Sequence, residues 1–159
     1  RFGVEKRENL ITLKVNEDLT PRKKDKLRIR IRMDFRGEEE IGRFFFGSKS
    51  SEFMAKKARD EQIELLKNIP IQGIDFEKFD ASLDVYFIQE QDKKGRKKEI
   101  AYAPVLITFT ADRLEDVIPL LTNRTLRKVE IISPEKITLE KSALEGLLYS
   151  FHKQITLVV

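Results

Sequence analysis

The chain has 159 residues, with 31 Lys and Arg against 27 Asp and Glu, and hydrophobic residues make up 40% of it. This length suits one domain around a single core, and the hydrophobic content argues against a disordered chain. The chain holds no cysteine, which excludes disulfides, thiolate metal sites and cysteine nucleophiles. We therefore expect a single globular domain, residues 1–159, in an intracellular, cytoplasmic setting.

Neither a membrane span nor a signal peptide is visible. No apolar run approaches the roughly eighteen residues that cross a bilayer, and residues 1–6 lack the apolar segment of a signal peptide. The chain opens without Met and closes on the apolar run 155–159, so we interpret it as a processed product or a domain cut from a longer protein. Its abundance of Lys, Arg and Glu over Asn and Gln is typical of proteins from hot environments.

Charge is unevenly distributed along the chain. Residues 1–36 carry twelve cations and six anions, residues 37–91 seven and twelve, and residues 92–159 twelve and nine. This asymmetry bears on surface potential and on anionic partners, but not on the fold.

Three strands are predicted first. Residues 8–16 alternate between apolar and polar in their second half, residues 26–35 alternate strictly, and residues 40–47 follow a break at Arg36 and Gly37. Together they predict an antiparallel three-strand meander at the N-terminal end.

The second of these strands is the most informative, because side chains on a strand point alternately to opposite faces. We expect its apolar residues to face a core: Leu27, Ile29, Ile31, Met33 and Phe35. Its cations, here called the Arg ladder, line the other face: Lys26, Arg28, Arg30 and Arg32. Guanidinium groups suit phosphate or carboxylate. The alternative is a solvated face neutralised by Glu38, Glu39 and Glu40 across the turn.

A helix of about five turns is predicted from Ser50 to Ile69, where a Ser cap precedes the apolar pattern and Pro70 ends it. Residues 70–80 are expected to be a connection. Strands at 81–89 and 99–110 should pair across the basic loop 92–98, called here the hairpin tip. Pro104 predicts a bulge or an edge position within the returning strand.

The last third begins with Asp112-Arg113-Leu114-Glu115, a pattern resembling a capping box with Asp at the cap, before a helix that Pro119 should keep short. Residues 126–132 predict a strand. Residues 140–153 predict the clearest helix, expected to dock by a stripe consisting of Leu144, Leu147, Leu148 and Phe151. Residues 155–159 are expected to form a terminal strand.

These elements predict an α+β fold with a mainly antiparallel sheet and about three helices. From residue 40 onward the expected order is β-α-β-β-α-β, which matches a ferredoxin-like unit. In that fold the first strand is central and leaves no free edge beside it for the Arg ladder strand. A separate layer of N-terminal strands, or a different topology, therefore stays open.

Catalytic and metal-binding patterns are weak. The single histidine, His152, has no visible partner for catalysis or metal binding. The run from Gly42 to Ser50 resembles a phosphate-binding P-loop but does not match its pattern, because an additional residue, Ser48, separates Gly47 from Lys49. Acidic residues at 38–40 and at 75, 77, 80 and 84 are interpreted as solvated turns and helix ends. We expect neither a metal nor a cofactor, and an enzyme that uses carboxylates alone is the least supported interpretation.

Two basic clusters carry the functional hypothesis. The main interpretation is a non-catalytic binding module for a polyanion, DNA or RNA, through Arg28, Arg30, Arg32, Lys93, Lys94, Arg96, Lys97 and Lys98. The alternative is a protein-interaction or regulatory domain that binds a protein partner or a second copy of itself without contacting nucleic acid. Its interface would use Phe44, Phe45, Phe46, Ile155 and Leu157.

Overall fold

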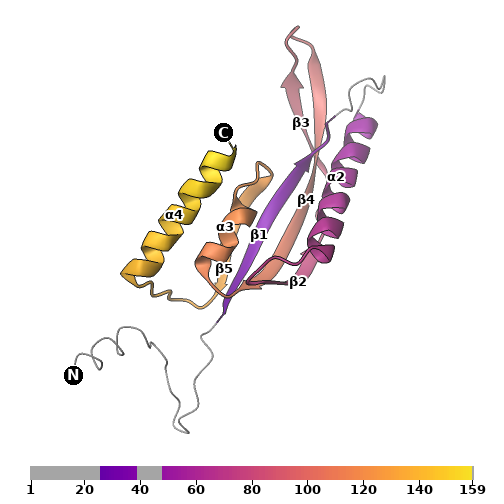
Figure 1. The fold of residues 1–159 in the computed structure, drawn as a ribbon. Helices are drawn as coiled ribbons and strands as arrows, with labels where there is room; N and C mark the ends of the chain where they lie inside the picture. The colour runs from indigo at the N-terminus through magenta and orange to yellow at the C-terminus, as the bar shows by residue number, and fades with distance from the viewer. Residues whose placement is uncertain (1–25, 39–47, 159) are drawn as a thin grey trace, which may run out of the picture.

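The computed structural model describes residues 26–38 and 48–158 (Figure 1). Its elements are β1 Leu27–Arg36, α2 Ser48–Asn68, β2 Ile74–Asp80, β3 Tyr86–Gln91, β4 Lys97–Ala111, the 3-10 helix η1 Leu114–Val117, α3 Ile118–Leu121, β5 Leu126–Ser133 and α4 Lys141–Val158. The described residues form one open sheet of five antiparallel strands with three α-helices. The predicted α+β class with a mainly antiparallel sheet is confirmed.

Strand β1 lies inside the sheet, whose order is β2-β4-β1-β5, with β3 also paired to β4. Strand β4 has 15 residues, and its other edge pairs with β3 at residues 97–102 and with β2 at residues 106–111. Pro104 falls in the gap between these two partners. Its nitrogen faces that gap, because the N–H of Asp34, the residue opposite it on β1, points the other way and donates to Thr125. Pro104 thus occupies a local edge position, as predicted for a proline, which has no N–H to donate to a neighbouring strand.

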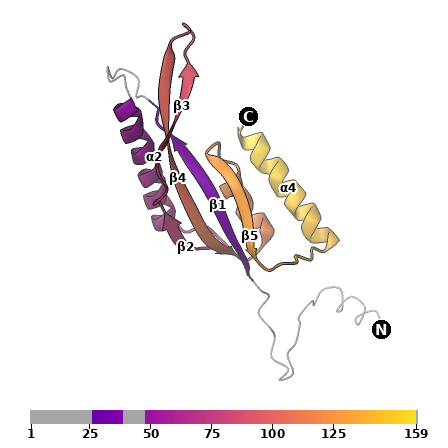
Figure 2. The same ribbon diagram turned by 180° about the vertical axis from the view of Figure 1, so that it is seen from behind.

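The core lies on one face of the sheet. All five apolar residues of β1 are buried, as predicted, and Ile107 and Phe109 of β4 are fully buried beside them. Helix α2 covers this face with Ile63 and Leu66, while η1 and α3 add Val117 and Leu120. Figures 1 and 2 show α2 and α3 over the same face and α4 beside the β5 edge.

Residues 74–80, expected to be a connection, form strand β2. A register shift between Phe76 and Lys78 explains why the strand was missed. The shift places Phe76 opposite Phe109 and Phe79 opposite Ile107, so residues three apart face the same core and the two-residue period is lost. The strand predicted at 81–89 is found only from Tyr86 onward.

Helix α4 differs from the prediction in two ways. It continues to Val158, so the terminal strand predicted at 155–159 is wrong for residues 155–158; nothing between Gly146 and Val158 interrupts a helix. The expected docking stripe is also wrong at three of its four residues, because Leu144, Leu148 and Phe151 are 45%, 63% and 45% exposed, whereas Leu147 is partly buried. Helix α4 instead makes its main contacts with η1 and α3.

Two further expectations need correction or stay open. The cap of η1 is Arg113 rather than Asp112, and the Arg113 N–H donates to Asp116 Oδ2. The ferredoxin-like order is not confirmed: β1 itself is central, and the strand predicted at 40–47 lies outside the described residues. The strand predicted at 8–16 lies outside them as well, so the three-strand meander stays a prediction.

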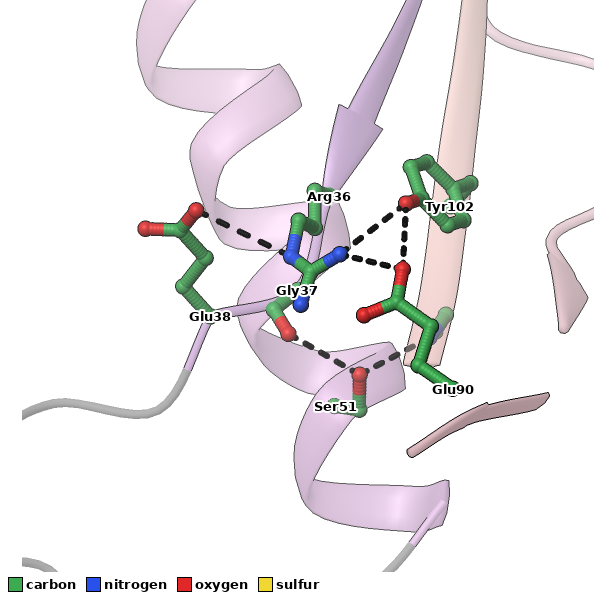
Figure 3. A network of polar contacts seen from close by, with 7 residues as sticks. Arg36, Gly37, Glu38, Ser51, Glu90 and Tyr102 are labelled. Atoms are coloured by element: carbon green, nitrogen blue, oxygen red, sulfur yellow. Dashed lines mark hydrogen bonds and ion pairs between the residues drawn. The ribbon is translucent and has the colours of Figure 1, made fainter. Parts of the chain in front are cut away.

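Gly37 joins β1 to the first turns of α2 and to β4 (Figure 3). Its N–H donates to the Ala101 carbonyl at 2.8 Å, and its carbonyl accepts from Ser51 Oγ at 3.0 Å. The same hydroxyl accepts from the Ala101 N–H at 2.8 Å. A Cβ at Gly37 would lie 1.9 Å from the Ser51 carbonyl oxygen. Only glycine allows these two backbones to approach so closely.

Gly37→Ala should therefore lower the free energy of unfolding by at least about 2 kcal/mol, because backbone must move to admit the methyl group. The control is Gly146→Ala, where a Cβ inside α4 meets nothing nearer than Glu115 Oε2 at 3.7 Å. That change should raise stability by about 0.5 to 1 kcal/mol through lower backbone entropy in the unfolded chain. Denaturant unfolding measures both free energies. If the two substitutions changed stability in the same direction, the close backbone approach at Gly37 would be contradicted.

Candidate polyanion-binding surface

The Arg ladder lies on the face of β1 opposite the core. Arg28, Arg30 and Arg32 succeed one another along the strand, and their side chains are 48%, 43% and 37% exposed. Opposite Arg28 and Arg30 on β4 are Thr110 and Thr108, whose short side chains leave room for long arginine side chains to reach neighbouring strands. The alternation read from the sequence thus places these cations in one row.

Every cation of this row contacts a carboxylate. The contacts are Lys26 Nζ with Asp75 at 3.2 Å and Asp112 at 3.4 Å, Arg28 Nη2 with Glu77 at 2.9 Å, Arg30 Nη2 with Glu130 at 2.8 Å, and Arg32 Nε with Asp34 at 2.8 Å. The Arg ladder is therefore a series of ion pairs with alternating sign, and a phosphate group must compete there with a protein carboxylate.

The acids that neutralise the ladder are not those considered from the sequence. Glu38 lies near Arg36, 3.8 Å from its Nε, and Glu39 and Glu40 lie outside the described residues. The partners found come from β2, from β5, from Asp112 just after β4 and from β1 itself. Strand order decides which acids are neighbours, and β2 was not predicted as a strand.

These ion pairs shift the pKa values of their members. Hydrogen bonding to Asp75, then to Asp112, raises the pKa of Lys26. The hydrogen bond from Arg30 lowers the pKa of Glu130, and Asp34 raises that of Arg32. Each charged form is thus favoured by its partner. Exposed pairs of this kind add little stability each, but they remove net charge from the sheet face.

Asp34 is the buried member of the series, with 3% of the residue exposed. It accepts hydrogen bonds from Arg32 Nε at 2.8 Å, from Arg32 Nη2 at 3.3 Å and from the Tyr86 hydroxyl at 2.6 Å. The Tyr86 ring stacks on Tyr102 at 5.3 Å, and the Arg127 guanidinium lies 5.9 Å from the Tyr102 ring centre. Burial, then the bond to Asp34, raises the pKa of Tyr86. This cluster ties the start of β3 to β1.

A second cluster holds β3 to the end of β1 (Figure 3). Arg36 Nη1 contacts Glu90 Oε1 and donates to the Tyr102 hydroxyl at 3.2 Å, which in turn donates to Glu90 at 3.2 Å. The Arg36 guanidinium holds the pKa of Glu90 below its ordinary value. The two clusters fix the direction in which the β3–β4 hairpin leaves the sheet.

The hairpin projects beyond the end of β1 and away from the rest of the molecule (Figures 1 and 2). Asp92 closes its turn by accepting from the N–H groups of Lys94 at 2.9 Å and Arg96 at 2.8 Å and from Arg96 Nε at 3.1 Å. Gly95 supplies a φ of 78°, which other residues rarely adopt. The bonds from the backbone of Arg96, above all, lower the pKa of Asp92.

The hairpin tip differs from the Arg ladder in its partners. Arg96 is paired with Asp92, and Lys98 is engaged within the structure. Lys93, Lys94 and Lys97 are exposed, and their ammonium groups contact no carboxylate in the described parts of the chain. The eight predicted binding residues therefore form two groups: three arginines paired on the sheet face, and five cations at the tip, three of them unpaired.

The interface residues of the alternative hypothesis are found in part. Ile155 and Leu157 are 49% and 76% exposed, on the last turns of α4. Phe44, Phe45 and Phe46 lie outside the described residues. The sequence prediction missed that Leu144, Leu148 and Phe151 are exposed as well, because their helical period was taken as the sign of a docked face.

The acidic residues that the structure describes do not converge on a site. Asp75 and Glu77 pair with the ladder, and Asp80 accepts from Ser82, which lowers its pKa. Among the residues that the structure describes, no group of three or more His, Asp or Glu side chains could hold a metal ion. A hollow of about 490 Å³ between the end of α2 and β2 has the charged side chains of Lys67, Asp75 and Glu77 at its wall.

No protein-family model, curated protein or solved structure matches this chain. Within the described residues, no helix is long and apolar enough to cross a membrane.

Tyr86→Phe should lower the free energy of unfolding by about 1 to 2 kcal/mol, because it removes a donor to the buried carboxylate of Asp34. Tyr149→Phe is the matched control: Tyr149 is 64% exposed and its hydroxyl makes no hydrogen bond with a described residue. The control should stay within about 0.5 kcal/mol of the parent. Equal losses in denaturant unfolding would contradict a structural role for the Tyr86 hydroxyl.

Glu90→Gln should make stability less dependent on pH in the acid range. The lowered pKa of Glu90 means that this group stabilises the fold above its unfolded pKa of about 4.3 and loses that effect as the pH falls through its folded pKa. The parent should thus be more stable than the variant at pH 7, with the difference shrinking toward pH 3. Glu99→Gln, an exposed position on the same hairpin, is the control; a constant difference for Glu90→Gln would contradict the ion pair.

Proposed function

We propose that this chain is a non-catalytic binding module for a polyanion, DNA or RNA, and that it makes its first contact through the hairpin tip. The observation that supports the proposal is the placement of Lys93, Lys94 and Lys97. They are exposed at the end of a projecting hairpin and contact no carboxylate within the described ranges. Free ammonium groups on a narrow projection can reach a phosphate backbone without first breaking an ion pair.

The Arg ladder has a smaller part in this proposal. Arg28, Arg30 and Arg32 already share their guanidinium groups with carboxylates, which offset part of their positive charge, so a phosphate contact there should gain less than one at the tip. Binding at the tip releases counterions from the nucleic acid and carries no base readout. We therefore expect affinity that depends strongly on salt and hardly on sequence.

A salt titration against DNA, RNA and heparin tests the proposal. Replacing Lys93, Lys94 and Lys97 by Gln should reduce the slope of log affinity against log salt by about 2 to 3 units, at roughly 0.7 to 0.9 per contact. The matched control replaces the exposed lysines Lys136, Lys141 and Lys153, which changes the net charge equally. This control should leave the slope unchanged. Absence of binding by the parent at low salt, or equal effects of the two triple variants, would overturn the proposal.

The ladder is tested separately by replacing Arg28, Arg30 and Arg32 with Gln. The expected slope change is smaller than that of the tip variant, because each arginine already has a carboxylate partner. If the ladder variant changed the salt slope more than the tip variant, the binding surface would be the sheet face, and the role proposed for the hairpin tip would be overturned.

The second candidate function is a protein-interaction or regulatory domain that binds a protein partner or a second copy of itself. Two observations favour it. The sheet face carries ion pairs of alternating sign rather than one positive field, and α4 exposes several large apolar side chains. This function does not depend on nucleic acid.

A further inference from the structure

Strand β5 begins with a group of cations that the sequence analysis did not single out. Arg127 and Lys128 are exposed at the start of the strand, and Arg124 is exposed in the turn before it; the three are called here the β5 cluster. None of them contacts a carboxylate within the parts of the chain that the structure describes. In this respect the β5 cluster resembles the three unpaired lysines of the hairpin tip and differs from the arginines of the ladder.

The pairing of β5 with β1 places the cluster beside the Arg ladder. Lys128 is directly opposite Arg32, so the two side chains share the face of the sheet that carries the ladder, here called the ladder face. The register shifts at the next step, which leaves Arg127 as an additional residue on β5, and such a bulge re-aims a side chain. The Arg127 guanidinium lies 5.9 Å from the ring centre of Tyr102, whose hydroxyl accepts from Arg36 on the same face.

The carboxylates near the β5 cluster are already engaged by other cations. Each of them contacts an arginine of β1: Asp34 with Arg32, Glu130 with Arg30, and Glu90 with Arg36. The charge of Lys128 adds to the lowering of the Glu130 pKa, after the larger effect of Arg30. One carboxylate thus stands against each of these three arginines, and the β5 cluster adds positive charge that none of them pairs.

The β5 cluster lies at the root of the β3–β4 hairpin, and the other unpaired cations lie at its tip. The turn before β5 is at the end of the sheet from which the hairpin projects (Figures 1 and 2). From Tyr102, beside Arg127, to Lys97 of the tip, β4 is extended over six residues, a length of about 17 Å. A single phosphate group can reach only one of these two places. Duplex nucleic acid carries a phosphate about every 3.4 Å along each strand and can reach both.

We propose that the β5 cluster is a second contact for the phosphodiester backbone of a nucleic acid, which lies along the ladder face of the hairpin from its root to its tip. The inference rests on the proposed function and adds a site to it. Arg127 suits this role because its guanidinium already lies over an aromatic ring, so it loses less freedom when it binds phosphate.

A salt titration with a DNA duplex of about 20 bp tests the second contact. Arg124→Gln combined with Lys128→Gln should reduce the slope of log affinity against log salt by about 1.8 units, at roughly 0.9 per contact. Arg127 is left in place, because its contact with the Tyr102 ring also belongs to the fold. The matched control combines Lys136→Gln with Lys141→Gln, two exposed lysines whose loss changes the net charge equally. The control should keep the slope of the parent.

The outcomes separate this inference from the proposed function. If the cluster variant behaved like its control while the tip variant still lowered the slope, the second contact would be overturned and binding through the tip would stand. Absence of binding by the parent at low salt would overturn both.

Photo-crosslinking tests which face of the hairpin the nucleic acid follows. The chain has no cysteine of its own, so Ile88→Cys and Phe87→Cys proteins can each be labelled at one position with a thiol-reactive photo-crosslinker. These neighbours are 44% and 43% exposed and point to opposite faces of β3, with Ile88 on the face of Tyr86, whose hydroxyl bonds Asp34. The label at Ile88 should give a crosslink yield several times that of the label at Phe87. Equal yields, or a higher yield from Phe87, would overturn the path along the ladder face.

Discussion

Strand β1 lies between two neighbours and must bury one face completely while carrying cations on the other. Successive cations on a strand face are about 7 Å apart, and cross-strand neighbours are closer still. Such a row repels itself unless anions are interleaved. This constraint explains the acids on the flanking strands: Glu130 is directly opposite Arg30 on β5, and Glu77 of β2 reaches Arg28 over the threonines of β4.

The positive charge of the molecule is therefore of two kinds. On the sheet face, the positive charges of the Arg ladder form ion pairs with carboxylates of the same sheet or next to it, and one of these carboxylates, the Asp34 partner of Arg32, is buried. At the hairpin tip Lys93, Lys94 and Lys97 are left unpaired by the described residues around them. Composition alone counts both kinds equally, and only their partners separate a structural cation from one that is available to a ligand.

Much of the fold follows from local patterns. The period of β1 assigned its buried face residue by residue, and helix α2, strand β5 and the basic hairpin were all predicted near their observed bounds. Strand β2 was not predicted from the sequence, because a bulge interrupts its alternation of apolar and polar residues and no other local pattern indicates a strand there. The carboxylate partners of the Arg ladder were not predicted for a related reason, since the order of strands in the sheet decides which acids lie beside it.

Helix α4 shows a different limit of sequence reasoning. Its periodicity correctly predicted a helix with an apolar face, but periodicity does not say what covers that face. The same pattern suits docking on the chain's own core and docking on another molecule. Here the attached side is marked by less obvious residues: Gly146, where a Cβ would lie 3.7 Å from Glu115 of η1, and Ser150, which is partly buried.

Strand β4 belongs to two parts of the molecule with different mechanical character. Its inner half, from Val105 to Ala111, is fixed by β1 and β2 and lies in the core, whereas residues 97–100 are paired with β3 alone. Residues 97–99 are exposed or half-buried and can therefore open and close their hydrogen bonds without disturbing the core, whereas Ile100 is already buried. The hairpin thus combines a rigid root with a compliant end, and the end can follow the contour of whatever it touches.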